Sequence, residues 1–200
     1  MRWTTIVAGV VVLAACGIDG APVSAGQPGI PAPAAPSVTA DRLDALLVPV
    51  SAVPGGLHPA GSASVPSTMS MGCAGDDASW FGPNTQGFRS ARYSGVGNRY
   101  VAQSVGLYAS AEEAAAVFRA AAQQVASCGN GSLSVDSVGG QRAAWHVSGT
   151  SAVSGANGVL AGYAAGVVGN VVFRVGAGLF DDPVAVANSV ADGIAANIGG

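Results

Sequence analysis

The chain has 200 residues, a formal net charge of −3 at pH 7 and a hydrophobic fraction of 50%, but only 6% of its residues are aromatic. This length suits one domain with additional segments rather than two full domains. A mildly acidic chain without lysine lacks the positive surface that nucleic-acid binding or a polybasic contact with anionic lipids requires, so nucleic acid is not expected as a partner.

The amino terminus has the parts of a bacterial lipoprotein signal peptide. Arg2 gives a positive start, residues 6–15 form an apolar run, and the sequence LAAC ending at Cys16 matches the lipobox. The run is shorter than the roughly 20 apolar residues that cross a membrane as a helix. We expect residues 1–15 to be removed and Cys16 to carry lipid (palmitate or similar chains) on the extracytoplasmic face of the cell membrane. A plain signal peptide with an incidental cysteine is the alternative.

Residues 16–38 are expected to form a tether between the lipidated Cys16 and the folded domain. They are rich in glycine, alanine, proline and serine and carry almost no charge. This composition favours extended, polyproline-like backbone and cannot build a core. The folded domain is therefore expected to cover residues 39–200.

The first half of the domain has few regular patterns. A helix is predicted over residues 40–48, with Thr39 as its N-cap and Pro49 as its stop. Residues 49–98 are rich in proline, glycine, serine and asparagine, which predicts mostly loop with short pieces of structure.

A strand predicted over residues 99–108 leads into the best-supported helix. Ser110 and Glu113 have the spacing of a capping box, in which Glu113 bonds back to the Ser110 amide, and Cys128-Gly129 is expected to end the helix. Its apolar stripe contains Ala114, Val117, Phe118, Ala121, Ala122 and Val125.

The last third of the chain predicts strands and a closing helix. The expected strands are residues 133–138, 143–148, 158–168 and 171–177. Gly169-Asn170 suits a two-residue hairpin turn, and Asp182 with Pro183 begins a helix. We therefore expect a single α+β domain, with helices packed on an antiparallel sheet.

Two cysteines remain once Cys16 carries lipid. Cys73 and Cys128 form an even pair in an oxidising compartment, which predicts one disulfide. Closing a loop of about 55 residues would remove roughly 4 kcal/mol of unfolded-state entropy. The alternatives are two free thiols or an intermolecular bridge.

The order of these features resembles a known family. The lipobox and tether are followed by Gln103-Ser104-Val105 with Tyr108, an alanine-rich helix containing Phe118, and Cys128 at the end of that helix. This order resembles the extracellular sensor domain of the mycobacterial kinase PknH, which also occurs in lipoproteins without a kinase. The resemblance covers roughly residues 39 to 198.

The resemblance implies an α+β domain with a central cleft for an unidentified ligand and no demonstrated enzymatic activity. It would also match Cys73 and Cys128 to one of that domain's bridges. The chain departs from the family in lacking a second cysteine pair. It also has Val125 where a tryptophan is expected.

The sequence offers little for catalysis, and no cofactor is expected. His58 and His146 are isolated, so neither metal-ligand spacing nor a catalytic base is indicated. The chain has no G-x-S-x-G nucleophile motif and no phosphate loop. The pairs Asp76-Asp77 and Asp181-Asp182 are interpreted as solvated turn and cap residues. We therefore expect neither a catalytic nor a metal site.

Arginine and aromatic residues gather between positions 88 and 100. Arginine beside aromatic rings suits an anionic or sugar-like ligand, through paired hydrogen bonds and stacking. The alternative is that these arginines solvate a loop and cover apolar surface with their stems. The candidate ligand-binding residues are Arg89, Arg92, Tyr93, Arg99, Gln103 and Tyr108.

The sequence therefore predicts a membrane-anchored lipoprotein of the cell envelope with a non-catalytic sensor or ligand-binding domain. An accessory or scaffold protein that binds another envelope protein is the main alternative, and an envelope hydrolase is a minor one.

The variant Cys16→Ala tests the lipid anchor. Each buried acyl methylene contributes about 0.8 kcal/mol to membrane attachment, so loss of the lipidated thiol should release the protein or leave the precursor uncut. Membrane fractionation with immunoblotting measures both outcomes, with Ser24→Ala in the tether as the control. A processed Cys16→Ala protein that stayed with the membrane would contradict the prediction.

Overall fold

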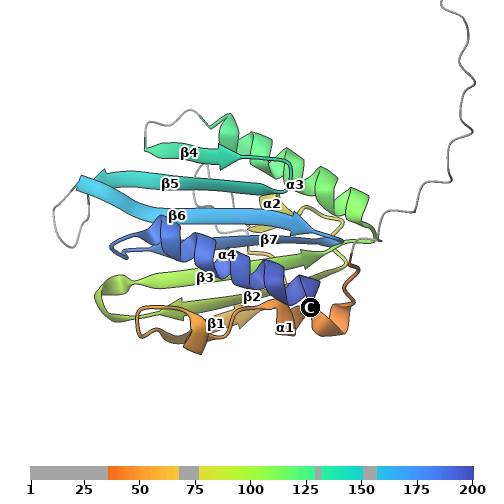
Figure 1. Cartoon of the computed structure of the whole chain (residues 1–200), viewed down its shortest axis with the longest axis horizontal. Coiled ribbons are helices and arrows are strands. Elements are labelled where there is room, and N and C mark those ends of the chain that lie inside the picture. Colours follow the sequence, from red (N-terminus) through yellow and green to blue (C-terminus); the bar gives the residue numbers. More distant parts are fainter. Residues whose placement is uncertain (1–35, 68–76, 129–131, 151–156) are drawn as a thin grey trace, which may run out of the picture. The chain divides into compact units, whose positions relative to one another are not determined.

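The computed structural model describes residues 36–67, 77–128, 132–150 and 157–200. They form one seven-stranded sheet in the order β1-β2-β3-β7-β6-β5-β4, in which every neighbouring pair is antiparallel. Helices lie on both faces of this sheet (Figure 1). The prediction of a single α+β domain with an antiparallel sheet is confirmed. Within the described ranges, no helix is long and apolar enough to cross a membrane.

The sheet consists of two meanders that meet along β3 and β7. The strands are β1 (His58–Ala63), β2 (Gly87–Ser94), β3 (Tyr100–Leu107), β4 (Leu133–Val138), β5 (Arg142–Thr150), β6 (Asn157–Val168) and β7 (Val171–Gly178). The helices are α1 (Leu43–Leu46), α2 (Asp77–Phe81), α3 (Ala111–Ala126) and α4 (Pro183–Gly199), with short 3₁₀ turns at Ala40–Arg42, Val50–Ala52 and Val96–Asn98.

Most of the predicted elements are present. The strand expected over residues 99–108 is β3. Of the four later strands, β4 has the predicted bounds, and β5 to β7 are each one to three residues longer than predicted. Ser110 accepts a hydrogen bond from the Glu113 amide at 3.1 Å, which confirms the helix start. The Glu113 carboxylate reaches the Ala109 amide at 3.2 Å instead of the Ser110 amide. Asp182 caps α4 by accepting from the Ala185 amide at 2.9 Å.

The helix predicted over residues 40–48 is shorter than expected. A 3₁₀ turn leads into the four residues of α1, and Thr39 makes no side-chain cap. Leu47 is already extended, which lets Val48 turn toward the sheet and bind Gln103. Pro49 favours an extended residue before it, which also opposes a longer helix.

The prediction that residues 49–98 are mostly loop is wrong for much of this range. It contains β1, α2 and the eight-residue strand β2, which pairs with β3 along its whole length. The sequence of β2, GFRSARYS, has no clear apolar alternation because one of its faces lines a polar hollow. A strand that is apolar on neither face gives no period-two signal.

The two faces of the sheet have separate apolar layers. Helices α1 and α4 cover one face and pack on Val101, Val105 and Phe173. Helices α2 and α3 cover part of the other face, where Trp80, Phe118 and Trp145 are buried. Strand β7 lies between the layers, and all eight of its residues are buried.

The β6–β7 turn holds the point at which the chain enters the domain. Gly169 has φ +54°, and a Cβ there would collide with the Pro36 carbonyl, so glycine is required. The Asn170 side chain accepts from the Val38 amide at 2.8 Å and donates to the Val38 carbonyl at 3.0 Å. It also donates to the Tyr108 carbonyl at 3.2 Å.

Gln103 makes a similar clamp on the face covered by α1. It is fully buried, accepts from the Val48 amide at 2.9 Å and donates to the Val48 carbonyl at 2.7 Å. Its amide also donates to the Tyr93 hydroxyl at 3.2 Å, and this hydroxyl donates to the Val48 carbonyl at 2.8 Å. The clamp gives hydrogen-bond partners to both the amide and the carbonyl of Val48. Without partners, burying these two groups would cost free energy.

Tyr108 is buried on the other face of the sheet, where it contacts α2. Its hydroxyl donates to the Phe81 carbonyl at 2.6 Å, and its side chain is buried. Burial raises the pKa of the Tyr108 phenol to about 12, an effect partly offset by a hydrogen bond with Thr85.

Gln103→Ala should lower the free energy of unfolding by about 2 kcal/mol, because it leaves the buried amide of Val48 without a partner and removes one of the two donors to the Val48 carbonyl. The exposed Gln123 of α3 is the matched control, and Gln123→Ala should change stability by less than about 0.5 kcal/mol. Urea unfolding of both variants measures the difference. Equal stabilities would show that the clamp contributes nothing.

The stability of the protein should fall between pH 10 and pH 12. The folded-state pKa of Tyr108 lies above its usual value of 10.0, so its contribution is complete below pH 10 and is lost as the pH rises through about 12. The loss should reach about 3 kcal/mol. Tyr108→Phe should show a smaller loss, and urea unfolding across this pH range compares the two proteins. Parallel pH profiles would contradict the assignment.

Candidate functional site

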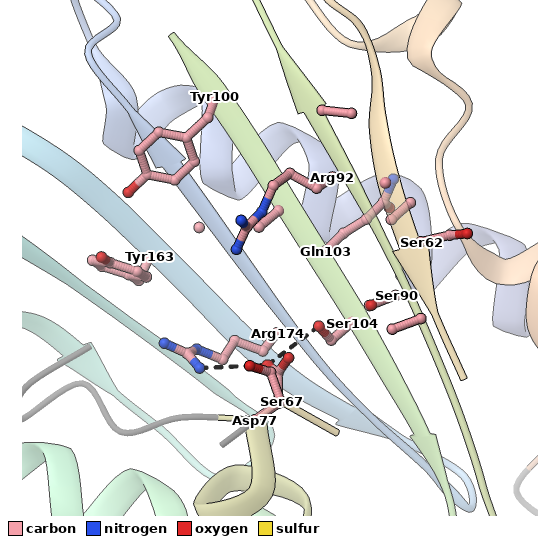
Figure 2. Close-up of a pocket in the computed structure, with 16 residues that line it drawn as sticks. Ser62, Ser67, Asp77, Ser90, Arg92, Tyr100, Gln103, Ser104, Tyr163 and Arg174 are labelled. Carbon is pink, nitrogen blue, oxygen red and sulfur yellow. Dashed lines mark hydrogen bonds and ion pairs between the residues drawn. The ribbon is translucent and has the colours of Figure 1, made fainter. Parts of the chain in front are cut away.

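A pocket of about 540 Å³ lies on the face of the sheet that carries α2 and α3 (Figure 2). It opens over β1, β2, β3 and β7, and Asp77 at the start of α2 closes one side. Its polar and aromatic lining residues are Ser62, Ser67, Asp77, Ser90, Arg92, Tyr100, Gln103, Ser104, Tyr163 and Arg174.

Strand register brings these residues together. Arg92 of β2 lies opposite Ala102 of β3, which lies opposite Gly176 of β7, which in turn lies opposite Tyr163 of β6. Ala102 and Gly176 have little or no side chain, so the middle of this row forms the floor of a hollow. The next row along the strands contains Ser90, Ser104 and Arg174.

Two tyrosines form one side of the pocket because β7 carries glycines beneath them. A Cβ at Gly176 would lie 2.9 Å from the Tyr163 ring, and a Cβ at Gly178 would collide with the Tyr100 ring. Each ring therefore lies flat over a glycine on the neighbouring strand. Figure 2 shows Tyr100 and Tyr163 on the same side of the hollow.

Arg174 is the buried cation of the pocket. Only 5% of the residue is exposed, although it lies between Phe173 and Val175 on an apolar strand. Its guanidinium lies 3.6 Å from the Asp77 carboxylate and 5.7 Å from the ring centres of Trp80 and Tyr163. A buried arginine needs such a counter-ion, and the aromatic faces add favourable cation–π contacts.

Asp77 connects this cation to β3. The Ser104 hydroxyl donates to the Asp77 carboxylate at 3.3 Å. The carboxylate therefore joins α2 to both central strands at the edge of the pocket, as the dashed lines in Figure 2 show.

A stack of three aromatic rings packs beside the pocket and includes its lining residue Tyr163. Trp145 stacks on Trp80 at 5.2 Å and 5°, and on Tyr163 at 5.5 Å and 7°. Burial, followed by the nearby Tyr100 phenol, raises the pKa of Tyr163, so this phenol stays protonated at neutral pH. The Trp145 indole N–H is buried without a hydrogen-bond partner in the described part of the chain.

Arg92 differs from Arg174 in being exposed and unpaired. Within the described ranges it makes no ion pair or side-chain hydrogen bond. Its side chain extends from β2 across the hollow toward the side that carries the two tyrosines (Figure 2). Arg92 is the one predicted ligand-binding residue whose charged group faces this pocket.

The structure does not bring the six predicted ligand-binding residues together. Arg89 lies on the opposite face of β2 from Arg92, where its guanidinium pairs with Asp44 at 3.0 Å. Arg99 lies over the Phe180 ring at 5.9 Å.

The remaining three candidates make structural hydrogen bonds. Gln103 borders the pocket, but its side chain and that of Tyr93 bind Val48 on the opposite face. Tyr108 binds Phe81 within the core. Gln103 and Tyr108 therefore lie on opposite faces of the sheet.

Several residues of the pocket were not singled out from the sequence. Asp77, expected as a solvated turn residue, is instead a partner of a buried arginine. Arg174 had a usable signal, since a lone arginine inside the apolar run of β7 indicates a paired or functional charge. Tyr163 had none, because its position depends on a glycine of another strand.

The other predicted sites lie partly outside the described residues. Cys16 and Cys73 belong to these undescribed parts, and Cys128 follows the end of α3. The Cys73–Cys128 bridge therefore stays a prediction.

His146 lies on the opposite face of β5 from Trp145, and its ring contacts Asp136 of β4 at 2.8 Å. The described residues contain no cluster of three or more metal-ligating side chains.

Comparison with known proteins identifies the fold and the family. The PknH-like extracellular domain family matches residues 38–197. The crystal structure of the extracellular domain of PknH from Mycobacterium tuberculosis aligns with a TM-score of 0.64 at 18% identity, covering 82% of this chain and 97% of that chain. At this identity, the structural likeness shows a shared fold. Comparison with curated proteins gave no match. Since the family model covers most of the sequence, the chain belongs to the PknH-like extracellular domain family.

Proposed function

We propose that this chain is a membrane-anchored lipoprotein of the cell envelope whose domain binds a small molecule and acts as a non-catalytic sensor. The family is extracellular, which agrees with an extracytoplasmic location. The observation that carries the proposal is the pocket in which Arg92, Tyr100 and Tyr163 meet around a floor of small residues. Lipid attachment at Cys16 and the Cys73–Cys128 bridge are part of the same proposal.

The size and lining of the pocket support ligand binding. Small-molecule sites usually enclose about 300–1,000 Å³ and combine apolar walls with a few polar groups. This pocket has about 540 Å³, with alanine and glycine at its floor and hydroxyl and guanidinium groups at its sides.

The other two candidate functions have less support. Val65 and Val96 are the most exposed large apolar residues among those described, and they lie outside strands and α-helices, where single apolar residues are ordinary. A scaffold role would need a contiguous apolar patch. A hydrolase would need a serine hydroxyl on the His146–Asp136 pair, and no such hydrogen bond occurs within the described residues.

Filling the pocket tests the proposal. Ala102 lies at the floor, so Ala102→Trp should occupy the space of the ligand, whereas Ala116→Trp on the exposed side of α3 should not. The full chain, purified in detergent and incubated with the low-molecular-weight extract of bacterial envelopes, would be examined by native mass spectrometry.

We expect a small-molecule adduct on the wild-type protein and on Ala116→Trp, and its loss from Ala102→Trp. Circular dichroism would establish that both variants are folded. An adduct that persists in folded Ala102→Trp, or no adduct on the wild-type protein, would contradict binding in this pocket.

A further inference from the structure

We infer that the ligand of this pocket is a singly charged organic anion, a carboxylate or a phosphodiester, whose charge is held by Arg92. This inference rests on the proposed binding function and adds the chemical class of the ligand. It follows from the balance of charges in the pocket and from the groups that surround Arg92.

Among the residues that the structure describes, the charged side chains that line the pocket are Asp77, Arg92 and Arg174. Asp77 and Arg174 are 3.6 Å apart and neutralise each other. This pair is held by Ser104 and by the rings of Trp80 and Tyr163. Within this described set, one positive charge, that of Arg92, remains to be balanced. A bound ligand with one negative charge would neutralise the pocket, whereas a cation would be repelled and a dianion would add an excess charge.

Arg92 differs from the other strand arginines of the described chain. Arg89 has Asp44 at 3.0 Å, Arg142 has Asp192 at 2.6 Å and Arg174 has Asp77. Every other arginine on a strand therefore has an aspartate of this chain. The guanidinium of Arg92 keeps its donors for a group from outside, and its planar fork matches carboxylate and phosphate oxygens.

The described polar groups near Arg92 are neutral hydrogen-bond donors. Ser62 and Ser90 lie on the neighbouring stretches of β1 and β2, and Tyr100 lies across the hollow. Tyr163 presents a neutral phenol on the same side as Tyr100. Hydroxyl groups can donate to the oxygens of an anion or to the hydroxyls of a polar body. Such surroundings suit one ionic contact supported by several neutral hydrogen bonds.

The small residues at the floor of the pocket and the two tyrosines beside them indicate the shape of the uncharged part of the ligand. Ala102 and Gly176 leave a shallow space beside the two tyrosine rings. A compact ring of sugar size would contact these apolar surfaces with its C–H groups and the serines with its hydroxyls. The anion would then lie at the side of the ring that faces Arg92.

The experiment compares defined probes on the full chain in detergent. The monoanions are glucuronate, which carries a carboxylate, and glycerophosphoglycerol, which carries a phosphodiester. Glucose serves as the neutral probe and glucose 6-phosphate as the more highly charged one. Calorimetric titration would measure each affinity for the wild-type protein, Arg92→Gln, Arg92→Lys and Arg89→Gln. The last variant is the matched control, because Arg89 lies on the same strand but faces away from the pocket.

We expect at least one monoanion to bind more tightly than glucose and glucose 6-phosphate. Its affinity should fall about 10- to 100-fold in Arg92→Gln, by the usual magnitude of a charged hydrogen bond, and should be partly kept in Arg92→Lys. It should be unchanged in Arg89→Gln, and added salt should weaken it.

Three results would overturn the inference. Neither monoanion binds more tightly than glucose; glucose 6-phosphate binds more tightly than both; or Arg89→Gln weakens binding as much as Arg92→Gln does. The charge specificity can fail while the proposed binding function stands. An envelope adduct that is lost in Ala102→Trp but kept in Arg92→Gln would leave the pocket as a ligand site and reject only its charge specificity.

Discussion

The burial of Arg174 is the constraint on which the site depends. A guanidinium placed among the valines of a central strand is tolerable only if a carboxylate and aromatic faces surround it. Asp77 supplies the carboxylate and thereby fixes the start of α2, while Trp80 from the same helix supplies a ring. The start of α2 is thereby held at one side of the pocket, against Arg174 and Ser104.

Much of the fold could be predicted from the sequence, because apolar alternation and helix caps are local signals. Ser110 and Asp182 began helices where expected, and the four later strands followed their valine and alanine pattern. Strand β2 was missed because one of its faces carries Ser90 and Arg92, which line a hollow, and so the strand has no apolar alternation. Proximity in sequence also misled the site prediction, since Arg89 and Arg92 lie three positions apart on a strand and so face opposite sides.

The composition of the chain explains why a hollow exists. With few aromatic residues, the domain places Trp80, Trp145 and Tyr163 in one stack instead of spreading them over the sheet. The glycines of β7 then admit rings from the strands on either side, and alanine is left at the floor. This packing of a tyrosine on one strand against a glycine on another produces no pattern that could be recognised in the sequence. It becomes visible only when the register is known.

The clamp of Asn170 on Val38 has a mechanical consequence. The chain enters the domain beside the β6–β7 turn, whereas Arg92 and Tyr100 lie toward the opposite ends of the central strands. A force acting between the entering backbone and an occupant of the pocket would run along β3 and β7. It would load their ladder of hydrogen bonds together, in shear, instead of opening them one after another. Tension between the Val38 end of the domain and the pocket would therefore be borne by the whole β3–β7 ladder at once.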